Sequence, residues 1–255
     1  MYTRAVFFYR VSPAFGMNMS SPSTLSLLSS TVGKKLVTGL TGLGLTLFVI
    51  GHMVGNLSFF VGHDAYNLYA YKLMSLGPLL YAIEAGLVLF FVGHAVTGIA
   101  IWLGKRQARP EGYARYASAK GASRQSTSSI SMVYTGSLLL VFLVLHLISF
   151  KFGPGGPGNA DPAYLTIVDG VEMRNLALLV EQKFQQPLYA FGYSIIMLLL
   201  ALHLRHGVWS AMQSLSLVRP SMSGAIYTGG AILGLGIALG FIVLPLWIFF
   251  GGATV

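Results

Sequence analysis

The sequence predicts an all-α membrane protein, a bundle of five transmembrane helices with the N-terminus in the cytoplasm and the C-terminus outside. Of its 255 residues, 55% are hydrophobic and only 9% are charged, whereas a soluble domain carries about 25% charged residues. Five apolar runs each reach the roughly 20 residues that a spanning helix needs. These runs are continuous rather than alternating, which favours helices over a closed β-barrel. The composition excludes a soluble enzyme, a disordered chain and a nucleic-acid-binding module.

The predicted spans cover residues 36–61, 78–104, 130–150, 187–213 and 225–250, each to within a few residues. In the first run, Gly39, Gly42 and Gly44 would weaken a soluble helix. In a membrane bundle, small residues let a helix or a flat cofactor approach closely. We therefore divide the chain into a cytoplasmic N-terminal arm, residues 1–33, and a transmembrane domain, residues 34–255.

Two segments outside the spans carry their own signals. The arm differs from a cleaved signal peptide because Ser20–Ser30 is too rich in Ser and Pro for an apolar signal core; a short interfacial helix is expected in it. The longest connection covers residues 151–186 and begins with Gly153–Gly158, whose alternating Gly and Pro exclude helix and strand. Within it, Tyr164–Phe184 is expected to form a short amphipathic helix on the outer surface.

Basic residues predict the orientation. They gather before the first span, between the second and third, and between the fourth and fifth: Arg4, Arg10, Lys34, Lys35, Lys105, Arg106, Arg109, Arg115, Lys120, Arg124 and Arg219. The opposite connections carry fewer bases and five acids: Asp64, Asp161, Asp169, Glu172 and Glu181. Because cytoplasmic loops carry the excess of Lys and Arg, the N-terminus is placed inside.

Four histidines lie inside four different predicted spans: His52, His94, His146 and His203. An ionisable residue in a span is costly and indicates function, although a single histidine can also bond a neighbouring helix. Counted at about 1.5 Å per residue, His52 and His146 lie near the outer face, and His94 and His203 lie in the inner half. The histidines thus form two pairs at matched depths.

Two such pairs suit two haem b groups, each bound by two histidines and needing no cysteine; the chain has none. Zinc requires three or four ligands at one point, and a proton relay would not require paired depths. Glycines near these histidines can let a flat porphyrin approach: Gly51, Gly93 and Gly207.

Other polar residues support more than one interpretation. His206 competes with His203 as the haem ligand, or bonds a haem propionate or a quinone. Arg205 neutralises a propionate or reaches the inner interface. Glu84, the one acid inside a span, exchanges protons with a quinone near the outer haem or reaches the outer interface. His63 is expected to be solvated in the outer loop.

Four short segments together resemble a known family: Gly51–Asn56, His94–Gly98, His146 at the end of the third span, and Leu202–Ala211. Their order and spacing over about residues 30–250 resemble the five-helix dihaem cytochrome b subunit of succinate:menaquinone oxidoreductases and quinol:fumarate reductases. The resemblance implies that His52 and His146 bind the distal haem, and that His94 and His203 bind the proximal one. It also favours His203 over His206, because the family's ligand lies four residues before the glycine at position 207.

The resemblance further implies a multi-pass subunit of a prokaryotic plasma membrane that anchors a flavoprotein subunit and an iron–sulfur subunit. Electrons from succinate would pass through both haems to a quinone, expected to be menaquinone; this chain alone would not act on succinate. Bases such as Lys35 would contact propionates, the partner or lipid headgroups, or serve only as positive-inside anchors. Some fumarate-reducing relatives carry a glutamate where this chain has Ala201, so their proton pathway is not carried over.

Two alternatives remain open. One is the dihaem cytochrome b subunit of another respiratory enzyme, such as a hydrogenase or formate dehydrogenase. The other is a haem-free membrane anchor or transporter. Haem content separates the haem-free anchor or transporter from both cytochrome b hypotheses. The sequence leaves open the physiological direction and any association of whole complexes into a higher oligomer.

Overall fold

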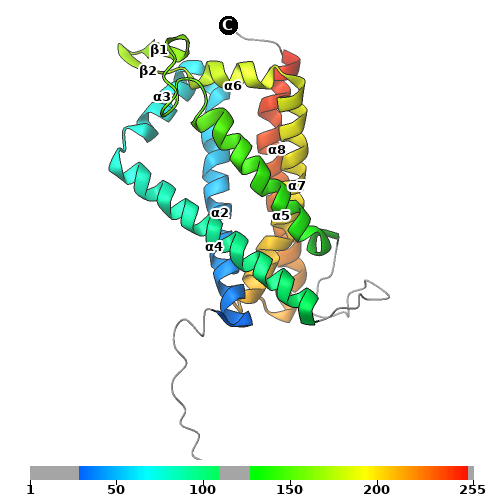
Figure 1. The fold of residues 1–255 in the computed structure, drawn as a ribbon. Coiled ribbons are helices and arrows are strands. Elements are labelled where there is room, and N and C mark those ends of the chain that lie inside the picture. The colour runs from blue at the N-terminus through cyan, green and yellow to red at the C-terminus, as the bar shows by residue number, and fades with distance from the viewer. Residues whose placement is uncertain (1–28, 109–126, 252–255) are drawn as a thin grey trace, which may run out of the picture.

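The computed structural model describes residues 29–108 and 127–251, a bundle of long helices with a small cap at one end (Figure 1). The predictions for the arm before residue 29 and for the loop bases at 109–124 lie outside the described residues. In chain order the elements are α2 (Thr31–Leu57), η1 (Ser58–Val61), α3 (His63–Met74), α4 (Pro78–Ala108), α5 (Thr127–His146), η2 (Leu147–Lys151), η3 (Pro162–Tyr164), β1 (Leu165–Val168), β2 (Val171–Arg174), α6 (Leu176–Phe184), α7 (Pro187–Ser214), η4 (Pro220–Met222) and α8 (Ser223–Gly251).

Five helical segments of the described chain are long and apolar enough to cross a membrane: Thr31–Val61, Pro78–Ala108, Ser131–Lys151, Pro187–Ser214 and Pro220–Gly251. They match the five predicted spans to within about five residues, because the length of an apolar run can be read directly from the sequence. The predicted all-α membrane bundle is confirmed.

Local capping signals explain where the spanning helices begin. The Ser30 hydroxyl accepts a hydrogen bond from the Gly33 amide at 3.0 Å, so α2 starts at Thr31 rather than near residue 36. The predicted arm is therefore shorter at its C-terminal end. Pro78 and Pro187 stand at the first positions of α4 and α7, where the missing amide hydrogen costs nothing.

Helices α7 and α8 pack against each other along their lengths, and glycines on α8 allow this. A Cβ at Gly234 would lie 2.8 Å from the Ala201 carbonyl oxygen, and one at Gly230 would lie 3.1 Å from that of Arg205. Small residues at such contacts let two backbones approach closely in a membrane. Helix α2 also packs on α7 at Gly39, where a Cβ would stand in ordinary van der Waals contact, 3.5 Å from the Ala211 backbone.

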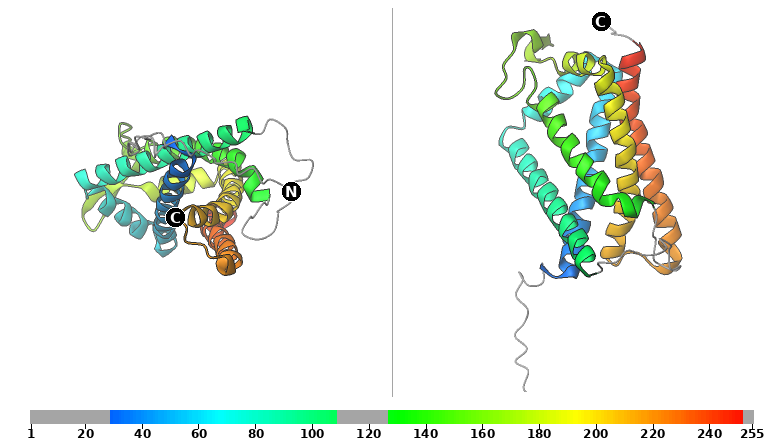
Figure 2. Two further views of the ribbon diagram at one scale, coloured as in Figure 1. Left: turned by 90° about the horizontal axis from the view of Figure 1, so that it is seen from below. Right: turned by 45° about the vertical axis from the view of Figure 1, so that its right-hand side comes forward.

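Helix α4 is inclined to the rest of the bundle. Figures 1 and 2 show it crossing α2 and lying well apart from α2 at the capped end, where α3 joins the two helices. Consistent with this, no described residue of α4 is buried. Buried side chains are found instead between α7 and α8 and in the cap.

The cap, formed by α3, β1, β2 and α6, differs from the prediction. Only Leu176–Phe184 of the expected helix Tyr164–Phe184 is helical, and residues 165–174 form a two-stranded antiparallel hairpin. Its turn is Asp169-Gly170, both at positive φ (51° and 76°). Asp-Gly between two short runs that contain β-branched residues is a strong hairpin signal, so the helix prediction was wrong because this local signal was overlooked. The helix α3 was also not predicted.

Buried polar groups hold the cap together. The Ala177 amide donates to Asn67 Oδ1 at 2.9 Å, and Asn67 Nδ2 donates to Asn175 Oδ1 at 3.1 Å. Tyr66, packed against Phe59 in the apolar cluster of the cap, donates its hydroxyl to Asn56 Oδ1 at 3.1 Å. Burial raises the pKa of Tyr66, and Tyr69 adds to this shift.

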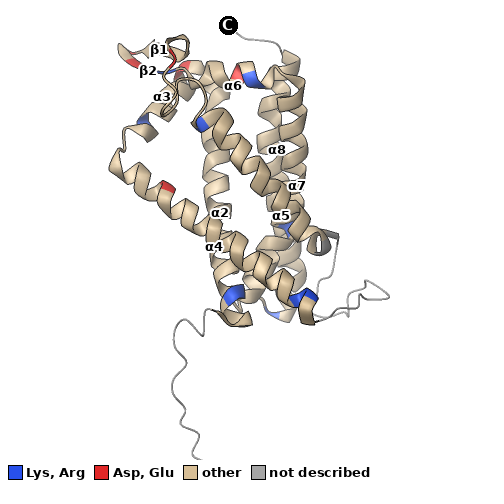
Figure 3. Cartoon of the chain, viewed as in Figure 1, with Lys and Arg blue, Asp and Glu red and all other residues tan. Residues whose placement is uncertain are grey.

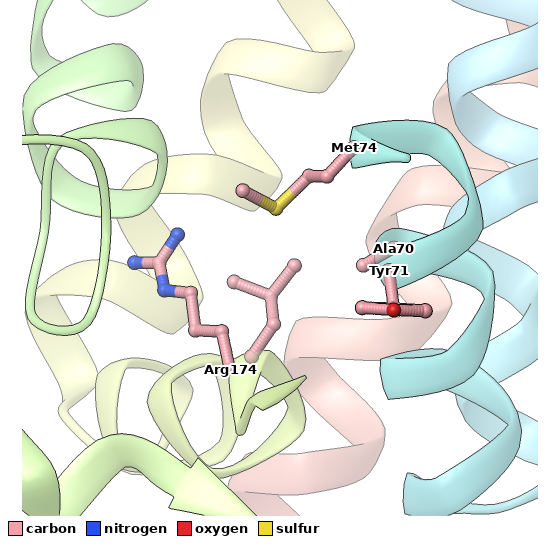
Figure 4. Close-up of a pocket in the computed structure, with 5 residues that line it drawn as sticks. Ala70, Tyr71, Met74 and Arg174 are labelled. Atoms are coloured by element: carbon pink, nitrogen blue, oxygen red, sulfur yellow. The ribbon is translucent and has the colours of Figure 1, made fainter. Parts of the chain in front are cut away.

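Arg174 ties the hairpin to the Gly-Pro loop. Its guanidinium donates to the carbonyl oxygens of Pro154 at 2.8 Å and Gly153 at 3.3 Å. Burial lowers the pKa of Arg174, while Tyr66 opposes the shift. Beside it lies a pocket of about 40 Å³ lined by Ala70, Tyr71, Met74, Arg174 and Leu176 (Figure 4). The guanidinium in this pocket already has backbone partners, which gives it a structural role.

Candidate functional site

The structure brings the four predicted histidines together as two pairs. The ring centres of His52 on α2 and His146 on α5 lie 5.7 Å apart at an interplanar angle of 86°. Those of His94 on α4 and His203 on α7 lie 6.2 Å apart at 67°. These are the two pairs that the depth count predicts.

Both separations fit two imidazoles on opposite sides of one metal ion. Metal–nitrogen bonds of about 2.0 Å and the size of an imidazole place the two ring centres about 6.3 Å apart. Rings in direct edge-to-face contact have centres about 4.5–7 Å apart, so distance alone does not decide between the two. The hydrogen-bond partners of the ring nitrogens provide a second criterion.

His94 donates one ring hydrogen to the backbone. Its Nδ1 lies 3.1 Å from the Thr38 carbonyl oxygen, and a carbonyl oxygen can only accept. Nδ1 therefore carries the hydrogen, and Nε2 keeps the lone pair that a metal ion needs. Metal-binding histidines almost always donate their other nitrogen in this way.

His203 also carries its hydrogen on Nδ1, here because of a side-chain partner. Its Nδ1 lies 3.1 Å from Thr135 Oγ1, and the Thr135 hydroxyl donates to the Ser131 carbonyl oxygen at 3.0 Å. Because the hydroxyl hydrogen is used, Thr135 accepts from Nδ1. Nε2 of His203 is again left with its lone pair, so His94 and His203 each have a ring nitrogen that is chemically able to bind a metal ion.

Glycines on two helices make room for the inner rings. A Cβ at Gly42 of α2 would lie 3.0 Å from Cε1 of His94, and one at Gly136 of α5 would lie 3.4 Å from Cε1 of His203. The outer histidines, His52 and His146, each follow ten residues later on these same two helices. Ten helical residues span about 15 Å, so both helices place the two pairs at distinct depths.

Aromatic side chains surround the outer pair. Phe48 and Phe241 lie beside His52, with ring centres at 5.6 Å and 5.8 Å, and Phe142, Phe150 and Tyr193 lie beside His146. Nδ1 of His146 is buried and has no hydrogen-bond partner among the described residues. An unpartnered buried nitrogen costs about 1–3 kcal/mol, which a bound ligand or water would offset.

Asn56 connects the outer pair to the cap. Its Nδ2 donates to the His52 carbonyl oxygen at 2.8 Å and lies 3.4 Å from His52 Nε2. Its Oδ1 accepts from Tyr66 of α3. The cap therefore reaches the outer pair through one amide side chain.

Neither His206 nor Arg205 takes part in the ring contact between His94 and His203. The His206 ring packs against Trp209, with ring centres 5.7 Å apart, and the Arg205 guanidinium lies 4.9 Å from the centre of the Tyr227 ring. Nδ1 of His206, Nε of Arg205 and Nε1 of Trp209 are buried without hydrogen-bond partners among the described residues. Two of the three are obligate donors, which suits a nearby acceptor such as a carboxylate.

The remaining predicted residues occupy the two ends of the bundle. Lys35 is exposed on the first turns of α2, and Figure 3 shows Lys and Arg but no acid at that end of the described chain. Glu84 on α4 forms an ion pair with Lys151 at the end of η2. His63 is not simply solvated, contrary to the prediction: its Nε2 is buried, 3.9 Å from Glu181 of α6, because α6 folds over α3.

Of the glycines expected to admit a porphyrin, Gly93 lies against α2, because a Cβ at this position would lie 3.7 Å from the Thr41 side chain. At Gly51 and Gly207 a Cβ would meet no heavy atom of the described chain within 4 Å. Sequence reasoning missed Thr38, Thr135 and Gly136, and it named Gly42 only as a small residue of the first span. Their only sequence signal is a small or hydroxyl residue within an apolar run.

The chain matches no protein-family model, no curated protein and no solved structure with which it was compared.

Proposed function

We propose that this protein is the membrane-anchor cytochrome b subunit of a succinate:quinone oxidoreductase, with His52 and His146 binding an outer haem b and His94 and His203 an inner one. The observation that supports this best is the pairing of the four histidines at 5.7 Å and 6.2 Å. When bound, the two haems supply one-electron transfer across the membrane. The assignment to succinate rests on the family resemblance of the sequence segments.

The residues of this chain have distinct tasks under the proposal. Thr38 and Thr135 fix the ring orientations of His94 and His203. Arg205 and His206 supply donors for the carboxylates of the inner haem. The aromatic side chains around His52 and His146 keep water from the outer pair, and a dry environment strengthens each electrostatic interaction there.

The two ends of the bundle serve different partners. The exposed base Lys35 and its neighbours contact an iron–sulfur subunit or bind anionic lipid headgroups. A flavoprotein subunit, bound to the iron–sulfur subunit, completes the complex. A membrane quinone, menaquinone by the resemblance, accepts the electrons near the outer pair. Glu84 is the acid of the spans available for proton exchange there.

A reduced-minus-oxidised spectrum of the purified protein tests the proposal. We expect a b-type spectrum with two haems per chain, of which His146→Ala removes the outer and retains the inner, and His203→Ala does the reverse. His206→Ala removes a proposed donor to a haem carboxylate but no proposed iron ligand, so it should keep both haems. Colourless protein would refute the haem assignment and leave a haem-free anchor or transporter.

The electron donor identifies the complex. The complex isolated from its native membrane should contain a flavoprotein and an iron–sulfur protein, and succinate should reduce both haems. Reduction by hydrogen or formate, but not by succinate, would instead identify the cytochrome subunit of a hydrogenase or formate dehydrogenase.

A further inference from the structure

One ion pair lies at the outer part of the bundle, between two elements that otherwise hardly touch. Glu84 Oε1 of α4 meets Lys151 Nζ at the end of η2. Each side chain is about one-third exposed, 33% for Glu84 and 32% for Lys151. Charges at a membrane depth are expensive unless paired, so the pair calls for an explanation beyond packing.

The pair lies toward the same end of the bundle as His52 and His146 (Figure 3). Glu84 precedes His94 by ten residues on α4, the same interval that separates Gly42 from His52 and Gly136 from His146. Measured along each helix, the interval is about 15 Å from the inner pair. Glu84 is therefore the charge that α4 contributes on the side of His94 that faces the cap.

Lys151 is tied to His146 through the backbone. The five residues after His146 form the π-helical turn η2, which ends at Lys151 and is closed by the bond from the Phe152 amide to the Leu147 carbonyl oxygen at 2.9 Å. Ser149 Oγ lies 3.3 Å from the Tyr189 hydroxyl, and Arg174 donates to the carbonyls that follow. The ammonium of Lys151 is thus carried on a fixed turn directly after a ligand of the outer pair.

We infer that Glu84 neutralises Lys151 and thereby sets the reduction potential of the group that His52 and His146 bind. The inference rests on the proposed function. Reduction of a haem iron adds one negative charge, so an unpaired ammonium nearby favours the reduced form and raises the potential. An unpaired carboxylate has the opposite effect. Together the two charges largely cancel. Glu84 therefore affects the potential by offsetting the charge of Lys151.

Redox titration of the intact purified complex tests the inference with two neutral variants. Glu84→Gln leaves the ammonium alone and should raise the midpoint potential of the outer haem, whereas Lys151→Gln leaves the carboxylate alone and should lower it. The double variant and the charge exchange Glu84→Lys with Lys151→Glu should both return close to the wild-type value. The inner haem should not move in any of them.

Two controls separate electrostatics from damage. Lys72→Gln removes one exposed positive charge of α3 that forms no ion pair within the described residues, and it should leave both potentials unchanged. Shifts of the same sign in both single variants, or no shift in either with two haems still bound, would overturn the inference and leave the haem assignment intact. Wild-type protein without haem would instead overturn the proposed function.

Discussion

At the scale of single residues, Thr135 decides how His203 is presented. Its hydroxyl accepts from Nδ1 of His203 while donating within α5. Thr135→Val keeps the shape of the side chain and removes the acceptor, so we expect inner-haem affinity to fall about 10–100-fold, the usual cost of losing such a partner. Haem titration of the variant measures this change.

Thr46 provides the matched control for Thr135. It is also buried in a span and donates to the carbonyl oxygen four residues earlier, but no histidine bond is found for it among the described residues. Thr46→Val should therefore keep both haems. An equal loss of haem in both variants would show that the hydroxyls serve the helices rather than His203.

The raised pKa of Tyr66 predicts how the stability of the protein changes at alkaline pH. Burial raises this pKa above the ordinary value of about 10, so the folded protein keeps a proton that the unfolded chain releases. This contribution to stability is complete below about pH 10 and is lost as the pH rises further. Tyr66→Phe should reduce the fall in unfolding temperature between neutral and alkaline pH. Tyr71→Phe on the exposed face of α3 should leave the fall unchanged.

At the scale of whole elements, the contact of α7 with α8 depends on the absence of side chains at particular positions. A side chain at Gly234 would press against the Ala201 backbone, whereas Gly236 on the same helix faces open space. Gly234→Val should lower the free energy of unfolding by about 1–3 kcal/mol, the usual cost of overpacking. Gly236→Val should have a much smaller effect. The free energies of unfolding of both variants are measured in detergent.

The elements of the cap show which structural features could be predicted from local sequence signals. The Asp169-Gly170 hairpin was readable from its turn residues, and the helix prediction failed there by weighing amphipathicity above turn chemistry. Helix α6 begins where Asn175 accepts from the Leu178 amide, a cap signal that the sequence also contains. The contact of His63 with Glu181 was not readable from the sequence, because it depends on how α6 lies across α3.

At the scale of the whole molecule, the distribution of charge predicts the orientation in the membrane. The chain has no cysteine, so single introduced cysteines report their side without background. Glu172→Cys in the cap and Ser221→Cys near the opposite end replace exposed residues. In intact cells a membrane-impermeant maleimide should label the first and not the second, because basic loops stay inside. The reverse pattern would invert the orientation and the assignment of inner and outer haems.

The five spans and the pairing of the four histidines could be predicted from the order of the residues alone. Both follow from counting residues along helices of fixed rise, and counting needs no knowledge of neighbours. Tertiary structure alone decided which groups meet: Thr135 with His203, Gly42 with His94 and Glu84 with Lys151. Those contacts depend on the rotation and tilt of each helix, which are set by packing against the others rather than by the helix's own residues.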